Sequence, residues 1–298
     1  MRMWRKGRCC RGLKKMQRKV FRSAGHCLLA ALSLLIQIPV LLLVTASFMP
    51  KDELLYRYAQ PLGMGAAAVR AALIPTYLTL EGYGQVLLRS RGFFVMFWNT
   101  CLQTGLLVLG QMAVGIPGAW AFAQVPFRGR DKLARLYILL MLLPFQVTEV
   151  SAYLVLDRLG LLDTHLAVIL PGIWSAFPVF IMSRFFQAIP RAMLEAARLD
   201  GAGELGVLLK VGIPVGKPGI VTAWMLGFFE SWNNIERPLA YIKDPALWPL
   251  SLYLSKIRGQ QGAAAFAACA IAMVVPVLFY LNGQEELEQG ICLDGVKE

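Results

Sequence analysis

The sequence predicts an all-α polytopic membrane protein with six transmembrane helices. Of its 298 residues, 57% are hydrophobic and only 16% are charged, and the mean hydropathy is +0.56. Such a composition lies well outside the average for soluble proteins. Several stretches with one charge or none also reach the roughly 20 residues needed to cross a hydrocarbon core about 30 Å thick. An ordinary soluble enzyme is therefore disfavoured.

Six apolar stretches are the predicted spans. They run over residues 27–48, 93–125, 136–156, 166–183, 218–235 and 262–281. The second is longer than one crossing and is expected to be broken or tilted near Pro117. The third contains Glu149 and the fifth contains Glu230, whereas the other four carry no charge. Prolines within the spans remove backbone donors that neighbours must compensate, which favours a transporter over a plain anchor.

The distribution of Lys and Arg predicts the orientation, because cytoplasmic flanks carry an excess of both. With the N-terminus inside, the inner segments hold 20 of the 30 basic residues. Both termini are therefore expected to be cytoplasmic. Residues 1–23 form a basic cytoplasmic tail and residues 24–298 form the six-helix domain. Ten basic residues in this tail account for much of the net charge of +12, so a membrane surface explains the charge better than a nucleic-acid partner does.

No cofactor or metal site is predicted in this chain. The six cysteines lack C-x-x-C spacing, and two histidines are too few for the usual His-based metal sites. Gly201–Gly206 spells G-x-G-x-x-G, but the preceding residues favour a helix instead of the buried strand that a dinucleotide site requires. Gly212–Pro218 resembles a phosphate loop with the wrong spacing. Any ATP dependence must therefore come from a partner.

The long inner segment between the fourth and fifth spans contains the strongest local signal. Pro190 and Gly201 bracket a predicted helix over residues 191–200, with Met193, Ala196 and Ala197 on one shallow face. A second helical stretch over residues 202–210 is expected to end before Pro214. The result is a helix–turn–helix at the cytoplasmic surface, able to enter a groove. An amphipathic helix resting on lipid is the alternative.

This segment resembles a known family motif. The pattern places Glu195–Ala197, then three residues, Gly201, nine residues, and Val211–Pro214 in order. It is similar to the EAA loop of permease subunits in bacterial binding-protein-dependent ABC importers, here at about residues 187–214. In that family the loop ends in I-x-L-P, so Val211 and Ile213 are replacements. The spacing matches throughout.

Other residues narrow the resemblance to the maltose-type carbohydrate permeases, and to the partner without a large extra periplasmic domain. These are Leu80–Tyr83, Trp232–Asn234 and the tail glycines Gly290 and Gly295. The resemblance implies a multi-pass protein of the bacterial cell (inner) membrane. It also implies three kinds of protein partner besides lipid: a second permease, two ATPase subunits that bind ATP and Mg, and an extracytoplasmic solute-binding protein.

The resemblance also implies how the EAA loop works. Its helix between Glu195 and Gly201 would be seated in a cleft of one ATPase subunit, and Gly201 would provide the turn. The ATPase-coupling residues are then Glu195, Ala196, Ala197, Asp200, Gly201 and Pro214.

Polar residues inside the spans are candidates for the translocation path, because such residues are costly in lipid. Residues 230, 233, 234 and 237 fall at i, i+3, i+4 and i+7, which predicts one polar stripe on an apolar helix. The candidates are Glu149, Glu230, Trp232, Asn233 and Asn234. The alternative is a structural pair between Glu230 and Arg237 that joins two permeases.

Two further functions are compatible with a membrane location. A self-contained secondary transporter or channel for a polar solute should show an internal repeat and several intramembrane acids. Span three contains one such acid. A membrane-embedded enzyme would need clustered acids or metal ligands, for which Asp157, Asp163 and His165 are the only hint. The sequence favours a transport role without catalysis by this chain.

Overall fold

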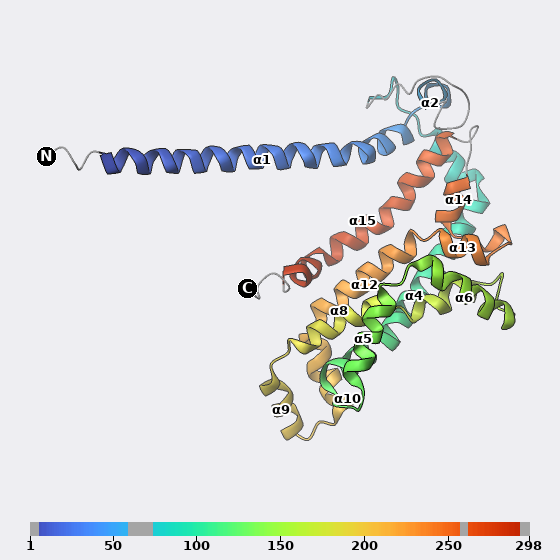
Figure 1. Ribbon diagram of the computed structural model, residues 1–298. Helices are drawn as coiled ribbons and strands as arrows, with labels where there is room; N and C mark the ends of the chain where they lie inside the picture. Colours follow the sequence, from blue (N-terminus) through green and yellow to red (C-terminus); the bar gives the residue numbers. More distant parts are fainter. Residues whose placement is uncertain (1–5, 59–73, 257–261, 293–298) are drawn as a thin grey trace. The chain divides into compact units, whose positions relative to one another are not determined.

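The computed structural model describes residues 6–58, 74–256 and 262–292, and its regular structure there is entirely helical (Figure 1). By length and composition, four helices could each cross a membrane, over Gly25–Ser47, Arg91–Gln124, His165–Gln187 and Ala263–Glu288. Two further pairs of shorter helices qualify if each bent pair is one span. The predicted all-α membrane architecture is therefore confirmed for the described residues, with four to six candidate spans.

The chain divides into two compact units, and the first comprises Met1–Tyr83 and Arg258–Ala267. Its helices are α1 (Lys6–Ser47), α2 (Lys51–Tyr58) and most of α3 (Glu81–Gly84). From Lys6 onward, the expected basic tail is part of α1 and not a separate element. Residues 1–5 of that tail lie outside the described residues.

A small apolar cluster organises the first unit. Ala46, Met49, Leu54 and Ala263 are buried together at the end of α1. The Ser47 hydroxyl contacts the Tyr83 hydroxyl at 2.7 Å, which ties the end of α1 to α3. By contrast, the leucines of α1 between residues 28 and 41 are largely exposed, as expected of side chains that face lipid or another subunit.

The second unit comprises Gly84–Ile257 and Ala268–Glu298. Its longer helices are α4 (Arg91–Gln124), α5 (Arg130–Met141), α6 (Phe145–Arg158), α7 (His165–Ile173), α8 (Ala176–Gln187), α9 (Arg191–Leu199), α12 (Lys217–Trp232) and most of α15 (Gly262–Cys292). The short elements are η1 (Gln85–Arg89), α10 (Glu204–Val207), η2 (Leu208–Gly212), α11 (Ile213–Val215), α13 (Glu236–Tyr241), η3 (Pro245–Leu247) and α14 (Leu250–Lys256).

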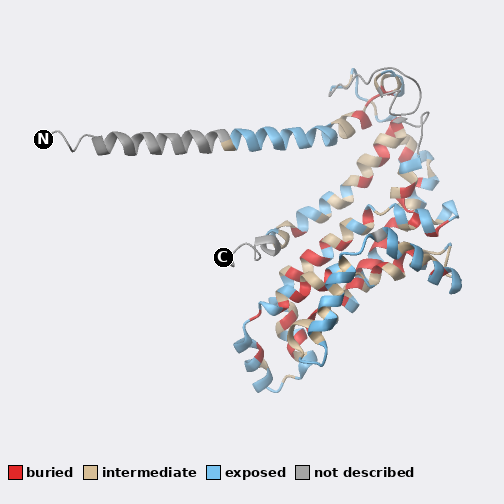
Figure 2. Ribbon diagram, in the orientation of Figure 1, coloured by how far each residue is buried: buried red, intermediate tan, exposed pale blue. Residues whose placement is uncertain are grey.

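Helices α4, α8 and α12 pack against one another and form the centre of this unit, with α7 beside α4. Figure 2 shows buried residues concentrated on these helices. Of the break or tilt expected near Pro117, the break does not occur, because α4 continues through that residue to Gln124. Small residues surround this proline, and Gly115 lies close enough to Met182 of α8 that a Cβ there would meet it at 2.8 Å. Close packing on α8 accompanies the continuous helix.

The third predicted span is not one straight helix. α5 ends at Met141, and the following helix leaves it at an angle of 100°. Pro144 precedes α6 with an extended ψ of 132°, and proline also disfavours helical backbone in the residue before it. Residues 136–156 therefore form a bent pair.

The fourth and fifth predicted spans also differ in detail from straight helices. The fourth is interrupted between α7 and α8, where Trp174 and Ser175 leave the helix. The Gln111 side chain of α4 donates a hydrogen bond to the Gly172 carbonyl at 2.9 Å, which satisfies an acceptor near the end of α7. The fifth ends at Trp232 instead of Ile235, and it meets the preceding helical segment at 76°.

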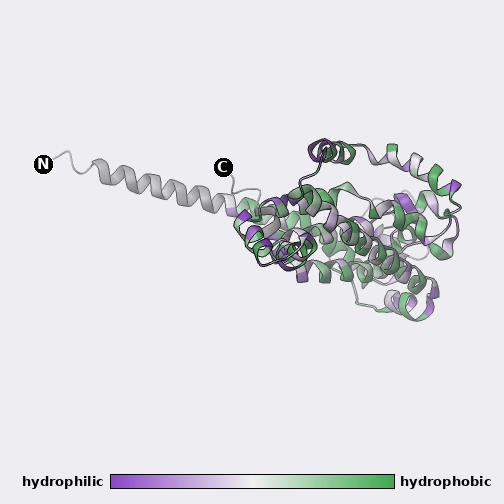
Figure 3. Cartoon of the chain, turned by 90° about the horizontal axis from the view of Figure 1, so that it is seen from below, coloured by the Kyte–Doolittle hydropathy of each residue, from purple (hydrophilic) through white to green (hydrophobic). Residues whose placement is uncertain are grey.

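The two ends of the second unit carry different elements. Figure 1 shows α9 and α10 at one end, and α13 and α14 at the other. Hydrophobic residues run along most of the length of the helices between them (Figure 3). α15 meets α12 through aromatic contacts, including stacked Phe228 and Phe279 rings with centroids 4.0 Å apart.

Candidate functional site

Helix α9 is held by one face and exposed on the other. Leu194 is 1% exposed and belongs to the apolar cluster that includes Trp120 of α4 and Phe186 of α8. Ala197 packs against the same cluster, whereas Ala196 is exposed. The predicted single face is therefore divided, because Ala197 turns inward. The outward face is available to a partner without disturbing the core.

The two ends of α9 explain why the helix is so well defined. Pro190 occupies the N-cap, where its missing N–H is no loss because the first N–H groups of a helix have no acceptor within it. At the other end Gly201 has φ +83°, its N–H donates to the Arg198 carbonyl, and the Ala202 N–H donates to the Ala197 carbonyl. These two bonds form a Schellman motif, for which glycine is the favoured residue.

The tip of this helix–turn–helix presents charged, small and apolar residues together. Glu195, Asp200 and Gly201 are exposed, as the coupling prediction requires. Leu199 and Leu205 are 88% and 69% exposed. Neither leucine was singled out from the sequence. Large apolar residues beside a turn that is expected at the surface were a signal that could have identified them. Exposed leucines at such a tip suit burial by a partner.

The segment after α10 differs from the second helix that the sequence predicts. Instead of ending near Lys210, the helical backbone continues as the π-helical η2 and then α11, which contains Pro214. The Ile213 N–H donates to the Leu208 carbonyl, five residues earlier. A π turn widens the helix locally and so accommodates a proline that cannot donate. Pro214 is exposed at this point.

Glycines let the connection from α9 to α12 pack closely on aromatic rings. A Cβ on Gly212 would lie 2.5 Å from the Trp120 ring, and one on Gly216 would lie 2.5 Å from the Phe186 ring. The rings of Trp120 and Phe186 pack edge to face, with their centroids 5.4 Å apart. The 76° bend at Gly216 is therefore packed against the core and is not a loose hinge.

Glu149 lies in a different place, at the opposite end of the unit. Its carboxylate pairs with the Arg237 guanidinium at 3.3 Å and accepts a hydrogen bond from the Tyr241 hydroxyl. The side chains of Glu149 and Arg237 are 15% and 13% exposed. Burial raises the pKa of Tyr241, and the hydrogen bond to the Glu149 carboxylate adds to this effect. The group joins α6 to α13.

A second set of hydrogen bonds fixes the loop beside α13. Asp163 adopts φ 61°, and its carboxylate accepts the N–H groups of Lys243 and Asp244, both at 2.8 Å. The Asp163 N–H in turn donates to the Tyr241 carbonyl at 2.9 Å. Asp163 therefore has a structural role in this loop. It was one of the three residues, together with Asp157 and His165, that hinted at an enzyme.

The predicted polar stripe does not lie on one helix. α12 ends at Trp232 and α13 begins four residues later, so the spacing of Glu230, Asn233, Asn234 and Arg237 is not carried by a continuous helical face. The Asn234 side chain instead accepts the Arg237 N–H at the start of α13. Within this chain the Arg237 guanidinium pairs with the carboxylate of Glu149. Glu230 is exposed.

Two of the path candidates line a hollow of about 370 Å³ between α4, α12, α14 and α15. Trp232 and Asn233 meet there with Thr100, Ser251 and Cys269. The wall combines a buried aromatic ring, which is stacked on Phe228, with an amide, hydroxyls and a thiol, so it offers an apolar surface and hydrogen-bonding groups. Asn233 is exposed, and its amide already donates to the Phe229 carbonyl at 3.0 Å.

A row of buried polar residues on α4 escaped the sequence prediction. Its members are Thr100, Gln103, Thr104 and Gln111. Their partners lie on α14, α7, η3 and α12: Thr100 accepts the Leu250 N–H, Gln103 bonds to His165 and the Leu247 carbonyl, Thr104 accepts from Ser231, and Gln111 donates to Gly172. Polar residues at i, i+3, i+4 and i+11 within an apolar span were the signal. The row attaches α4 to its neighbours.

The geometry defines a class: a helical membrane protein of four to six spans that presents an anchored helix–turn–helix at one end. Within the described residues, no group of three or more His, Cys, Asp or Glu side chains is placed to hold a metal ion. The family described as "Binding-protein-dependent transport system inner membrane component" matches residues 112–291. The chain belongs to this family, which confirms the resemblance to ABC importer permeases.

Individual relatives agree with this assignment. The chain is 31% identical to Protein LplC of Bacillus subtilis over 244 residues, which cover 80% of this chain and 76% of that protein. It is 24% identical to the arabinooligosaccharides transport system permease protein AraQ of Halalkalibacterium halodurans, covering 87% of this chain and 90% of that protein. This chain is therefore a permease subunit of an ABC importer.

A solved structure shows the same fold. A bacterial ABC transporter involved in the import of the acidic polysaccharide alginate contains a chain that matches with a TM-score of 0.75. The match covers 90% of this chain and 96% of that one, at 22% identity. At that identity the match supports the fold, and the family and relatives carry the function.

Proposed function

We propose that this chain forms one half of a two-permease channel that imports a carbohydrate or a related polar solute. The relatives named for arabinooligosaccharides and for polygalacturonan or rhamnogalacturonan transport support a carbohydrate cargo. In this proposal two separate ATPase subunits bind ATP and Mg, and an extracytoplasmic binding protein delivers the solute. The chain is a multi-pass protein of the bacterial inner membrane, and its own residues perform no catalysis.

The proposed topology has six crossings with both termini in the cytoplasm. It treats each bent pair, α5 with α6 and the segment up to α11 with α12, as one crossing. The excess of basic residues on inner segments supports this orientation. The end of the second unit that carries α9 is then cytoplasmic, and the end that carries α13 and α14 faces outward.

In the proposed coupling step, α9 is seated in a cleft of one ATPase subunit. The observation that carries this proposal is that α9 is anchored through Leu194 while Glu195, Ala196, Asp200 and Gly201 remain exposed. ATPase closure would move α9, and the glycine contacts would pass that movement to α12 as a lever. Inverting a 1:99 equilibrium between two states requires about 5.5 kcal/mol of differential contact energy.

The proposed path for solute includes the hollow beside α12. Asn233 and Ser251 would bond to sugar hydroxyls, and Trp232, which is buried and stacked on Phe228, would form the apolar wall behind them. Asn234 and Glu230 remain path candidates near the end of α12. Glu149 has a different proposed role, since its bonds to Arg237 and Tyr241 occupy its carboxylate.

Substitutions in α9 test the coupling proposal. Ala196→Arg and Gly201→Asp should abolish binding of the ATPase subunits or ATP-driven uptake, while membrane insertion stays normal. Gly201→Asp also strains a backbone that requires positive φ. Ala240→Arg is the matched control, because Ala240 is exposed on α13 at the other end. Normal uptake by Ala196→Arg would contradict the proposal.

The cargo and the energy source are tested with the assembled complex. A carbohydrate should co-purify with the binding protein or raise its melting temperature, and proteoliposomes should take it up only when ATP is present inside. If this chain alone carried solute down an ion gradient, it would act as a secondary transporter and the ATP-driven mechanism would fall.

A further inference from the structure

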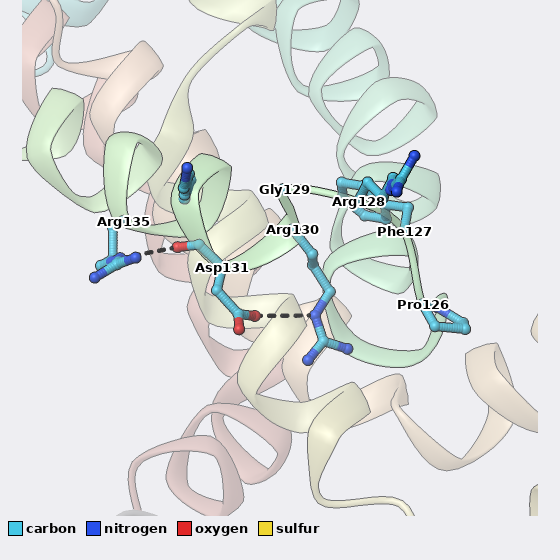
Figure 4. A pocket seen from close by; sticks show the side chains of 8 residues that line it. Pro126, Phe127, Arg128, Gly129, Arg130, Asp131 and Arg135 are labelled. Atoms are coloured by element: carbon cyan, nitrogen blue, oxygen red, sulfur yellow. Dashed lines mark hydrogen bonds and ion pairs between the residues drawn. The ribbon is translucent and has the colours of Figure 1, made fainter.

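The loop between α4 and α5 forms a basic hollow that plays no part in the coupling or path proposals. Its volume is about 640 Å³, and it is lined by Pro126–Lys132 and Arg135. Figure 4 shows the side chains of Arg128, Arg130, Asp131 and Arg135 around it. The site is built by a short loop with Gly129 at φ +87° and by the first turns of α5.

The charge of the hollow is strongly positive. Four cationic side chains, from Arg128, Arg130, Lys132 and Arg135, stand against the single carboxylate of Asp131. Arg130 pairs with that carboxylate at 3.2 Å, and Arg135 donates to the Asp131 carbonyl at 3.2 Å. Arg130 and Arg135 are therefore oriented by contacts with Asp131. An excess of three positive charges favours an anionic occupant.

The same face of α5 continues as an apolar stripe. Lys132 and Arg135 are followed at helical spacing by Leu136 and Leu139, which are 47% and 58% exposed. Leu143, which is 42% exposed, lies just beyond the end of α5 at Met141. Two cations therefore stand directly above exposed leucines on one helix. This order matches a membrane interface, where basic side chains meet headgroups and leucines meet acyl chains. A soluble acidic protein would fit the cations but would leave the leucines uncovered.

The hollow lies at the same end of the unit as α9. Gln124, the last residue of α4, donates to the Phe186 carbonyl near the end of α8. Phe122 of α4 meets both Phe127 of the loop and Tyr137 of α5, with ring centroids 6.2 Å and 5.3 Å apart. These contacts brace the loop against α4 and α5. The site is thus built into the fold at the end that the inner-segment charges assign to the cytoplasm.

We propose that this hollow binds the headgroup of an anionic phospholipid, with its acyl chains along the leucines of α5. Arg128 and Lys132 are the phosphate-binding residues best placed for a test, because none of the contacts described above depends on their side chains. The proposal concerns lipid and does not depend on which solute is carried.

The test measures lipid binding to the purified assembled transporter by native mass spectrometry. The complex is titrated with phosphatidylglycerol or with phosphatidylcholine of the same acyl chains. The preference for phosphatidylglycerol over phosphatidylcholine should fall about 25-fold in the double variant R128Q/K132Q and about fivefold in R128Q alone. The reason is that each basic residue near an anionic surface contributes about fivefold in affinity. The control R158Q/K243Q removes two exposed charges elsewhere and should keep the preference.

Three results would overturn the proposal. The first is an unchanged preference in R128Q/K132Q or in R128Q alone. The second is binding of glycerol phosphate as tight as that of phosphatidylglycerol, because the site would then serve a soluble phosphate and not a lipid. The third is loss of the ATPase subunits from R128Q/K132Q with the lipid preference intact, which would make the surface a protein contact.

Discussion

The two ends of the second unit are held together by different kinds of contact. Around α9 and α12 the contacts are apolar and very close, with glycines seated against the rings of Trp120 and Phe186. Around α6, α13 and α14 an ion pair and hydrogen bonds, chiefly those of Glu149, Arg237 and Tyr241, stand beside a smaller apolar cluster that includes Leu156 and Ala167. Close apolar packing resists deformation, whereas hydrogen bonds and ion pairs can be exchanged for other partners.

This difference suits the two ends to different tasks. A lever must transmit a displacement without absorbing it, and the α9 end has the packing for that. A gate must take up two arrangements, and polar contacts can break and reform with small changes in position. We therefore expect substitutions at the polar end to alter the stability of one arrangement, and substitutions at the glycine end to disturb the core itself.

The largest expected effect follows from removing the carboxylate at the polar end. Glu149→Ala leaves Arg237 largely buried without that carboxylate, and we expect a loss of about 3 kcal/mol in the free energy of unfolding. Thermal unfolding of the purified complex measures it. Glu236→Ala, at an exposed site on α13, is the control and should change stability by at most about 0.5 kcal/mol. Equal melting temperatures for the two variants would show that the ion pair does not hold α6 to α13.

Overpacking the other end should have the next largest effect. Gly216→Ala places a Cβ 2.5 Å from the Phe186 ring, which is completely buried, and should cost about 2 kcal/mol of stability. Gly206→Ala is the matched control, because its Cβ would meet only Ala202 at 3.5 Å. The comparison of melting temperatures and ATP-driven uptake tests whether this end is a rigid connection. A Gly216→Ala protein as stable as the control would mean that the rings move aside easily.

Tyr241→Phe should have a smaller effect that depends on pH. Loss of the hydroxyl bond to Glu149 should cost about 1.5 kcal/mol near neutral pH. The raised pKa of Tyr241 means that the folded protein holds the phenolic proton more tightly than the unfolded chain does. This part of the stability is therefore present below the ordinary pKa of about 10 and is lost as pH rises above it.

Melting curves between pH 8 and pH 11 check this expectation. The wild-type protein should lose its advantage over Tyr241→Phe toward the alkaline end of the range. A difference in melting temperature that stayed constant over the range would show that Tyr241 does not titrate with a raised pKa.

The smallest effect is expected at the exposed pair across the α9 turn. Arg198 and Glu204 are 3.0 Å apart, and their side chains are 39% and 53% exposed. Glu204→Gln should therefore change stability by no more than about 0.5 kcal/mol. If the melting temperature fell by many degrees, this pair and not the buried Leu194 would be the main anchor of α9.

Local features were the most predictable from the amino-acid sequence. α9 begins after Pro190 and ends one residue before the expected Asp200, because proline and glycine act through their own backbone geometry. The bend before α6 had a visible cause in Pro144, yet the same residue type at Pro117 leaves α4 unbroken. The position of a proline in the sequence does not by itself decide whether a helix bends, because the outcome depends on whether neighbouring helices satisfy the backbone groups that the proline leaves without partners.

Features that depend on distant residues were predicted poorly. The stripe of Glu230, Asn233 and Asn234 assumed a helix that continues past Trp232, and the chain instead turns there to begin α13. The buried polar row of α4 was overlooked because its partners come from four separate segments. Spacing along one helix shows which residues share a face, but not what covers that face.

Composition and short-range chemistry were enough to establish that the chain enters a bilayer, that its apolar stretches are helical, and that a turn follows α9 at Gly201. These follow from the cost of unsatisfied backbone groups in lipid and from backbone preferences of single residues. Folding alone chose Arg237, 88 residues away in the chain, as the partner of Glu149, and Leu194 as the anchor of α9. Such pairings depend on how whole helices pack, and no short stretch of sequence contains that information.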